Sequence, residues 1–310
     1  MNFPSNKTVI IIAGPTAVGK TSVAIVLAKY FDTEIISADS RQCFKELNIG
    51  VARPSAKELK EAKHLFIASH SIKDEITAAE FEKFALKKVN DLFSKHDVVI
   101  MVGGTGLYIK AFCDGLDKIP RIDSLIREKI TESYNEKGLA WLQEEVKKKD
   151  PSFYEAGEIH NPQRMMRALE VLESTGQSIL EFRKGKKEIR GFRIIKIGME
   201  LPKEELYRFI SKRVDAMIEN GLVEEVKSLQ SYKHLNALQT VGYKEIFRYL
   251  DGEISLSTAT GDIKKNTRQY AKRQMTWFRK DKEISWFHSG ETDKIIEFVS
   301  RELQKSKSPN

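Results

Sequence analysis

The chain has few cysteines, no long apolar run and no segment of low complexity. Only Cys43 and Cys113 occur in 310 residues and they form no C-x-x-C pair, which argues against a disulfide framework and against a cysteine zinc site. No apolar stretch approaches the ~18 residues that a membrane-spanning helix needs. The run from Val9 to Ala13 is also too short for a secretory signal. We therefore expect a cytoplasmic protein that makes no contact with a membrane.

Positive charge exceeds negative charge. Lysine and arginine total 52 against 44 acidic residues, so the formal charge is +8, and the sequence pI is near 9.2. Such a surplus favours a polyanionic partner such as nucleic acid, although ordinary enzymes also carry it. With 41% hydrophobic and 31% charged residues the composition is that of a soluble globular protein, and the length predicts about two domains.

The most specific motif is a phosphate-binding loop near the N-terminus. A strand-like apolar run, residues 8–13, precedes it, and residues 21–31 after it have helical periodicity. The loop matches G-x-x-x-x-G-K-[ST] at every fixed position with Gly14, Pro15, Thr16, Ala17, Val18, Gly19, Lys20 and Thr21. In this motif the glycines turn backbone N–H groups toward phosphate, the lysine adds a charge and the hydroxyl can ligate Mg²⁺. The alternative, a loop that merely turns the chain, is disfavoured because a strand and a helix flank it.

Two further predicted strands end near this loop. Residues 34–39 place Asp39 at the carboxyl edge of the sheet, where its carboxylate is available for catalysis, for a metal or for capping a helix. Residues 97–102 run into Gly103, Gly104 and Thr105, and not into the Asp that helps hold Mg²⁺ in most P-loop nucleoside triphosphatases. A motor ATPase or a GTPase switch is therefore disfavoured. The two glycines either leave room for a ligand or make a tight turn.

From about residue 117 the chain changes to highly charged helices, predicted over 124–137, 139–149 and 161–174. Asn161 as N-cap and Pro162 in the first turn begin the last of these. Since residues 192–199 resemble another strand, we predict an α/β fold: a P-loop NTPase-like parallel sheet flanked by helices, with a helical insertion and a helical C-terminal part. The predicted division is 1–116 and 191–303 for the core, 117–190 for the insertion and 304–310 for a disordered tail.

Residues 262–282 form the most basic segment. It holds eight lysines and arginines against two aspartates, together with Met275, Trp277 and Phe278. Basic and aromatic residues together suit RNA, because phosphates provide affinity and unstacked bases lie on aromatic rings. The alternative is a solvated basic helix that is packed through its aromatic residues.

In order and spacing, these motifs resemble those of the bacterial tRNA dimethylallyltransferases over nearly the whole chain. Besides the phosphate loop, the matching segments are Asp39–Gln42, Ile49–Gly50, Arg53–Pro54, Val102–Thr105, Asn161–Arg164, Val241–Tyr243, Thr267–Gln269 and Ala271–Gln274. The family commonly has Tyr, Thr and Lys where Phe44, Val51 and Arg53 stand, so we leave these three out of the predicted site. No cysteines suit the C-terminal zinc finger of the eukaryotic relatives.

The resemblance implies a reaction. The phosphate loop would hold the diphosphate of dimethylallyl diphosphate, and the dimethylallyl group would pass to the exocyclic N6 of the adenosine 3′ of the anticodon in tRNA (position 37). Charge that grows on the departing diphosphate would be met by backbone N–H groups, Lys20, Arg213 and Mg²⁺ at Thr21. Asp39 would be the general base for N6. Thr105 would also be a catalytic residue, since its hydroxyl could hydrogen-bond to the flipped adenosine.

The resemblance also implies tRNA contacts, and a flipped adenosine needs new stacking and hydrogen bonds. The candidate contacts are Asp39, Ser40, Arg41, Gln42, Thr105, Arg127, Gln163, Arg164, Met165, Met166, Arg167, Arg268, Lys272 and Arg273. We expect the protein to act on tRNA as a monomer.

Three other functions fit parts of the sequence. A small-molecule or nucleotide kinase would use the same loop for ATP and would release ADP. A non-catalytic RNA-binding protein would not need the intact Gly19-Lys20-Thr21 together with Asp39. An enzyme that prenylates free AMP would not need the basic 264–282 segment or the helical insertion.

Overall fold

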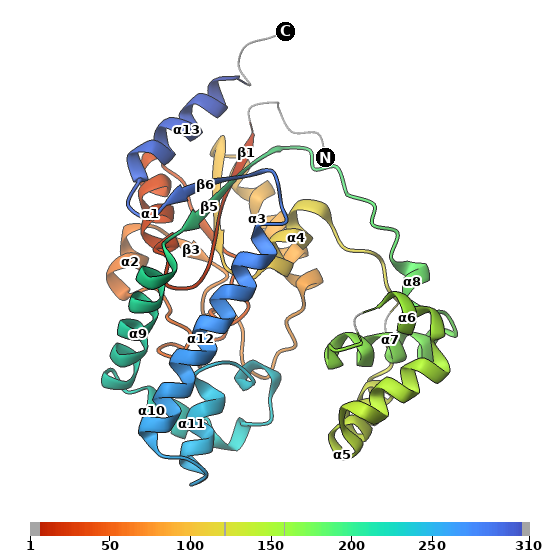
Figure 1. Cartoon of the computed structure of the whole chain (residues 1–310). Helices are drawn as coiled ribbons and strands as arrows, with labels where there is room; N and C mark the ends of the chain where they lie inside the picture. Colours follow the sequence, from red (N-terminus) through yellow and green to blue (C-terminus); the bar gives the residue numbers. More distant parts are fainter. Residues whose placement is uncertain (1–6, 121, 158, 306–310) are drawn as a thin grey trace. The chain divides into compact units, whose positions relative to one another are not determined.

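The chain is shown in Figure 1 as a computed structural model, which describes residues 7–120, 122–157 and 159–305. These residues divide into two units. The larger unit combines Met1–Cys113 with Ile189–Asn310, and the smaller is Asp114–Glu188. The predicted insertion, 117–190, has its first and last residues a few positions later than those of the smaller unit. That this unit is a functional domain which contacts tRNA stays a prediction.

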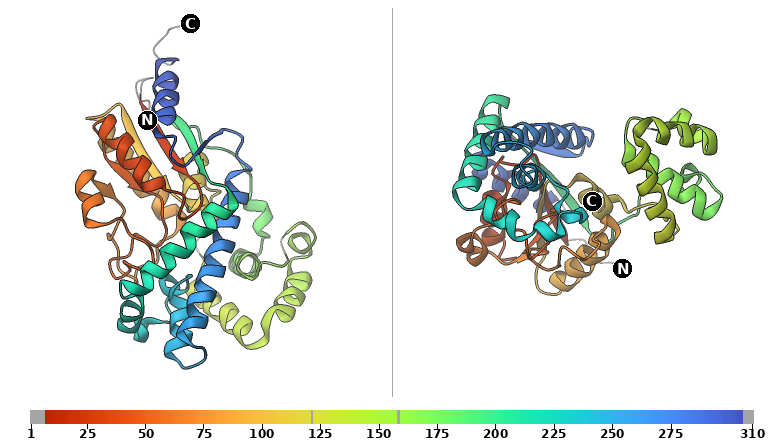
Figure 2. Two further views of the ribbon diagram at one scale, coloured as in Figure 1. Left: turned by 60° about the vertical axis from the view of Figure 1, so that its left-hand side comes forward. Right: turned by 90° about the horizontal axis from the view of Figure 1, so that it is seen from below.

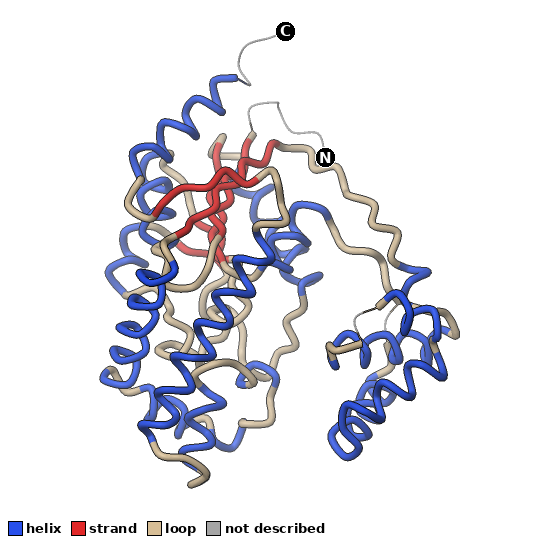
Figure 3. The backbone as a smooth tube through the Cα atoms, viewed as in Figure 1, coloured by secondary structure: helices blue, strands red, loops and turns tan. Residues whose placement is uncertain are grey.

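A parallel sheet forms the centre of the larger unit, and Figure 3 shows its strands gathered among helices. The strands are β1 (Thr8–Ala13), β2 (Ile35–Ser37), β3 (His64–Leu65), β4 (Val98–Gly103), β5 (Arg193–Glu200) and β6 (Ile284–His288), in the spatial order β3-β2-β4-β1-β5-β6. Ala13 at the end of β1 lies opposite Gly103 of β4 and Gly198 of β5. The carboxyl ends of three strands therefore meet at one edge, where open parallel sheets bind ligands.

Alternate residues of β1 pack into two hydrophobic cores, one on each face of the sheet. Val9 and Ile11 belong to one core, and Ile10 and Ile12 belong to the other. The first core is covered by α3 (Ala78–Phe93), α4 (Gly106–Asp114), α10 (Leu222–Ser228) and α11 (Tyr243–Leu250); the second is covered by α1 (Lys20–Tyr30) and α13 (Thr292–Lys305). Burial on both faces explains why the strands are continuous apolar runs, and it confirms the predicted α/β class.

Two long helices contribute to both cores and run side by side in Figures 1 and 2. They are α9 (Lys203–Glu219) and α12 (Leu256–Phe278). Ser255 caps α12 by accepting a hydrogen bond from the N–H of Thr258. The apolar face of α12 buries Phe278, so this ring is core and not a free stacking surface.

The C-terminal prediction needs a correction. A tail was predicted from residue 304, but α13 continues through Lys305, because Ile295 and Val299 anchor the helix in the second core. Residues 306–310 lie outside the described part of the chain. No helix within the described ranges is long and apolar enough to cross a membrane.

The smaller unit is helical and has its own core, built around Leu142, Phe153 and Leu169. Its helices are α5 (Ser124–Lys149), α6 (Pro151–Ala156), α7 (Pro162–Thr175) and α8 (Ile179–Phe182). Gly138 interrupts α5 with φ 77°, at the boundary between the two helices that the sequence predicts there. Asn161 caps α7 as predicted, by accepting a hydrogen bond from the N–H of Arg164 at 3.3 Å. Short helices α2 (Ala56–Glu61), η1 (Gln230–Tyr232) and η2 (Asn236–Leu238) complete the larger unit.

Candidate active site

The phosphate loop joins β1 to the first turn of α1, and its backbone bends in ways that few residues allow. Gly14 has φ 147°, Ala17 has φ 66°, and Gly19 has φ 89° at the N-cap of α1. A Cβ on Gly14 would also lie 2.6 Å from the carbonyl oxygen of Met199 in β5. These conformations form the curved run of N–H groups that binds anions at a helix N-terminus. Thr16 to Thr21 line a cavity of about 480 Å³.

Lys20 is the lysine of the phosphate loop itself. Its Nζ donates a hydrogen bond to the carbonyl oxygen of Pro15 at 2.6 Å. Burial lowers the pKa of Lys20 to about 7, with a further lowering from the positive charge of Arg213 and an opposing effect from Asp39. The amine is therefore half charged near neutral pH, and a bound polyanion would favour its charged form.

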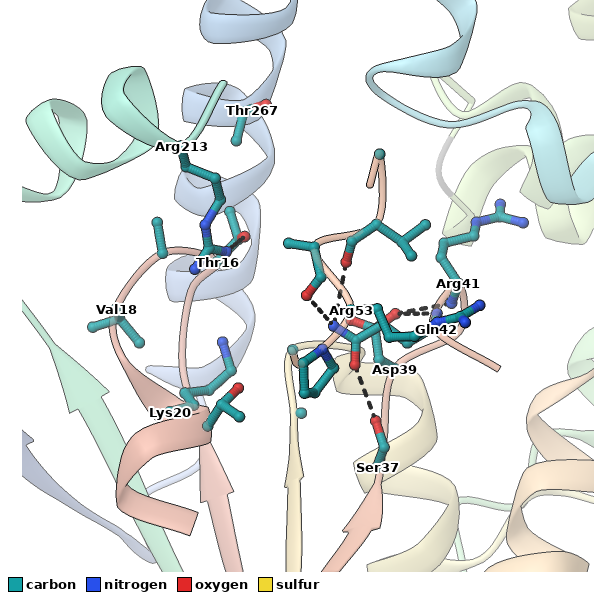
Figure 4. A pocket seen from close by; sticks show the side chains of 18 of the residues that line it. Thr16, Val18, Lys20, Ser37, Asp39, Arg41, Gln42, Arg53, Arg213 and Thr267 are labelled. Carbon is teal, nitrogen blue, oxygen red and sulfur yellow. Dashed lines mark hydrogen bonds between the residues drawn. The ribbon is translucent and has the colours of Figure 1, made fainter. Parts of the chain in front are cut away.

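Arg213 reaches the loop from α9, which lies far along the chain. Its Nη1 donates to Oγ1 of Thr16 at 3.3 Å, and burial lowers the pKa of this guanidinium. In Figure 4, Lys20 and Arg213 point toward the same part of the cavity. The structure therefore places two cations from distant segments at the phosphate loop.

Asp39 lies two residues beyond β2, on the opposite wall of the cavity from Lys20 (Figure 4). Its Oδ1 accepts hydrogen bonds from the N–H groups of Arg41 at 2.8 Å and Gln42 at 3.1 Å. No hydrogen bond from another described residue reaches Oδ2. One carboxylate oxygen thus caps the following turn, while the other is available to a ligand, so the capping and catalytic interpretations are compatible.

The neighbours of Asp39 form hydrogen bonds within the larger unit. Gln42 donates through Nε2 to the carbonyl oxygens of Val51 and Ala52, at 3.2 and 3.0 Å. The Nη1 of Arg41 donates to the carbonyl oxygen of Asn236 at 3.0 Å. Ser40 and Gln42 line the cavity together with Arg41. These contacts hold the turn in place and leave its side chains at the cavity wall.

Thr105 stands next to the cavity, just after β4. Its Oγ1 accepts a hydrogen bond from the N–H of Ser40 at 3.1 Å, which ties the turn after β4 to the turn after β2. Tyr270 of α12 lines the cavity close by, and burial, followed by the negative charge of Asp39, raises the pKa of its phenol to about 12. Tyr270 therefore remains a neutral aromatic ring, and the sequence did not single it out.

The loop from Asn48 to Pro54 is held by a carboxylate that sequence reasoning missed. Glu225 of α10 accepts hydrogen bonds from the N–H groups of Asn48, Ile49 and Gly50 at 3.2, 2.8 and 3.0 Å, and from the hydroxyl of Tyr243 at 2.6 Å. This network brings residues 50–54 to the cavity. The distance in sequence hides it, because only folding brings α10 beneath the loop.

The three departures from the family pattern have different surroundings. Phe44 is buried in a hydrophobic core, where a hydroxyl would need a partner. Val51 and Arg53 both line the cavity. The Nη2 of Arg53 donates to the carbonyl oxygens of Phe44 and Lys45, at 2.7 and 3.0 Å, and to that of Leu47. The charge of Arg53 therefore organises residues 44–47 at the edge of the site.

The predicted tRNA contacts on α12 separate into two kinds. Lys272 and Arg273 are exposed, and the guanidinium of Arg273 lies 5.8 Å from the ring centre of Tyr270. Arg268 instead packs against Tyr207 at 5.2 Å and donates through Nη2 to Ser211 at 2.9 Å. Arg268 thus links α12 to α9, which makes it the weaker candidate for an RNA contact.

Two of the tRNA contacts predicted in the smaller unit are wrong. Met165 and Met166 are 0% and 5% exposed in its hydrophobic core, so their side chains are not available to RNA. The residues on the other side of α7, Gln163 and Arg164, are exposed. Arg167 donates to Glu170 at 2.9 Å, and Arg127 lies 3.6 Å from the same carboxylate. These four polar residues remain predicted contacts.

The chain is similar to known proteins along most of its length. Residues 42–281 match the family model described as IPP transferase. The chain is 50% identical to the tRNA dimethylallyltransferase of Christiangramia forsetii over 94% of this chain and 97% of that protein, and 45% identical to that of Cytophaga hutchinsonii over 97% and 99%.

Two solved structures are similar along nearly the whole chain. The tRNA isopentenylpyrophosphate transferase of Bacillus halodurans is 32% identical, covers 97% of this chain and 98% of its own, and has a TM-score of 0.72. A eukaryotic dimethylallyltransferase acting on tRNA is 25% identical over 95% of this chain and 80% of its own, with a TM-score of 0.77.

Proposed function

The chain belongs to the IPP transferase family and transfers a dimethylallyl group to tRNA, and on that premise we propose the acceptor atom and the residues that act on it. The acceptor is the exocyclic N6 of the adenosine 3′ of the anticodon, at position 37 of the tRNA. The donor is dimethylallyl diphosphate. The observation that carries this proposal is one cavity that brings together a phosphate loop with its Lys20, the cation Arg213 and the carboxylate of Asp39, from three separate segments.

The phosphate loop, Lys20 and Arg213 hold the diphosphate. As the bond between the allylic carbon and the diphosphate oxygen breaks, negative charge grows on the leaving group. Cations and N–H groups that are already in place stabilise this charge, because they need no reorganisation during the reaction. After burial, the closeness of Arg213 is the second cause of the lowered pKa of Lys20, and the charge of the leaving group offsets that repulsion.

Asp39 acts on the acceptor from the opposite wall. The lone pair of an adenine N6 is delocalised into the ring, so the amine must lose a proton as its bond to the allylic carbon forms. The free Oδ2 of Asp39 takes that proton, while Oδ1 stays bound to the turn. The ring of Tyr270 and Ser40 border the space where the adenine would lie. Thr105 holds Ser40 there by accepting a hydrogen bond from its N–H.

The residues around the loop suit Mg²⁺. Thr21, which lines the cavity, offers a hydroxyl, an oxygen donor of the kind that Mg²⁺ prefers. The described residues contain no cluster of three metal-ligating side chains, which fits an ion that is held largely by substrate phosphates. Bound there, Mg²⁺ would neutralise part of the charge of the diphosphate.

The proposed acceptor is tested with two unmodified tRNA transcripts that differ only in the nucleotide 3′ of the anticodon, adenosine in one and guanosine in the other. With labelled dimethylallyl diphosphate and Mg²⁺, we expect label in the first transcript and none in the second. Equal labelling of both would refute the assignment of this adenosine. We propose that the enzyme acts in the cytoplasm and that it is a monomer. Sedimentation of the purified protein at micromolar concentration would check the monomeric state.

A further inference from the structure

Gln274 of α12 joins the phosphate loop to the turn after β4. Its side-chain Oε1 accepts a hydrogen bond from the N–H of Thr16 at 2.9 Å, and its Nε2 donates one to the carbonyl oxygen of Gly104 at 2.9 Å. Only 7% of the residue is exposed. A neutral amide is suited to this place, because it offers an acceptor and a donor at once.

Gly104 leaves the space that this side chain fills. A Cβ on Gly104 would lie 2.2 Å from Nε2 of Gln274, while the next nearest atoms, Cδ of Gln274 and the carbonyl oxygen of Gly14, lie at 3.4 and 3.5 Å. The backbone of Gly104 is not in the left-handed region. Among the described residues, the one steric reason for glycine here is therefore the amide of Gln274.

The hydrogen bonds of Gln274 connect the proposed diphosphate site with the proposed acceptor site. Thr16, whose N–H donates to Gln274, also accepts a hydrogen bond from Arg213 through its hydroxyl. On the other side, α12 carries Tyr270 at the cavity and the exposed Arg273 next to Gln274. A shift of Gln274 would thus move the phosphate loop relative to the acceptor wall.

We propose that Gln274 is a positioning residue of the transfer reaction, which keeps the phosphate loop in register with the turn after β4. It acts through Thr16 and Gly104, to which both polar atoms of its side chain are hydrogen-bonded. The inference rests on the proposed function, because it concerns the alignment of the allylic carbon with the acceptor nitrogen. A misplacement of about 1 Å at this step costs on the order of 10²-fold in rate.

The first test replaces Gln274 by Met, which keeps the length of the side chain and removes both hydrogen bonds. We expect kcat to fall by roughly 10- to 100-fold, while KM for tRNA changes less than about threefold, since the exposed RNA-facing residues remain. Gln274→Glu restores the acceptor for Thr16 and sets a second oxygen against Gly104, so it should rescue only part of the rate. Gln230→Met, the same change at an exposed residue of η1, is the matched control and should keep the wild-type rate.

The second test is a double-mutant cycle between Gly104→Ala and Gln274→Ala. Gly104→Ala alone should slow transfer as much as Gln274→Ala does, because its methyl group displaces the amide. In the Gln274→Ala background the space is open, and Gly104→Ala should add less than about twofold. Losses that multiply, or a melting temperature that falls while kcat is unchanged, would overturn the positioning role.

Wild-type protein in the same assays separates the two claims. If wild type transfers no label to tRNA, the proposed function fails. If wild type transfers label and Gln274→Met matches it in kcat, the inference about Gln274 fails while the proposed function stands.

Discussion

The affinity of the phosphate loop for the diphosphate should depend on pH through Lys20. Burial and the neighbouring Arg213 lower the pKa of this amine to about 7 in the free protein. A bound diphosphate favours the charged amine and raises its pKa again. Binding is therefore strongest below pH 7, where Lys20 already carries its proton, and it weakens as the pH rises because the proton must then be taken up from solvent.

The size of the effect follows from the pKa. About half of the Lys20 amines are charged at pH 7, and about one in a hundred is charged at pH 9. If the pKa in the complex lies above 9, affinity falls by about 50-fold between these two pH values, or ~2.3 kcal/mol. The logarithm of the association constant should approach a slope of about −1 per pH unit above pH 8.

The assay is calorimetric titration with a non-reactive thio analogue of dimethylallyl diphosphate at constant Mg²⁺, from pH 7 to 9. The terminal phosphate of such an analogue, with a pKa of about 6, is already ionised over this range. Lys20→Met is the control, and it should bind weakly with no slope. A flat profile in the wild-type protein, or the same slope in Lys20→Met, would show that Lys20 does not set the pH dependence of binding.

Three further predictions address other parts of the site. Asp39→Asn keeps an oxygen for the capping hydrogen bonds but removes the general base. Single-turnover transfer should therefore slow by ~10²-fold or more, while tRNA affinity in filter binding changes only a few-fold. An unchanged rate would mean that Asp39 has only a structural role. Arg273→Ala should reduce the salt dependence of tRNA binding by about one unit of slope, whereas Arg268→Ala should mainly lower the melting temperature, and the reverse outcome would exchange their roles. Gly14→Ala should abolish analogue binding in calorimetry, because its methyl group would press against the carbonyl of Met199; retained affinity would contradict the close approach of the loop to β5.

Local patterns in the sequence were sufficient for most of the fold. The phosphate loop, the strand before it and the helix after it are specified by residues within about 25 positions of one another, so pattern and motif coincide. The break in α5 was also predictable, since Gly138 separates two periodic runs. Caps such as Asn161 act within a single turn and are visible for the same reason.

The parts that were missed depend on contacts between distant segments. Gln274 meets Thr16 and Gly104 only after α12 has packed against the sheet, and Glu225 reaches the 48–50 loop in the same way. The resemblance also misjudged Met165 and Met166, because a match that covers a whole segment does not say which side of a helix is buried. Side-chain roles that rest on tertiary packing therefore needed the structure.

Nucleoside analysis of the product tests the proposed transfer to N6 of adenosine most directly. Unmodified tRNA is incubated with the protein, Mg²⁺ and labelled dimethylallyl diphosphate, and is then digested to nucleosides. We predict that the label elutes with N6-dimethylallyladenosine, that one diphosphate is released for each labelled adenosine, and that ATP is not hydrolysed. Label on another base or on another atom of adenosine, or ATP hydrolysis without label in the RNA, would contradict dimethylallyl transfer to N6.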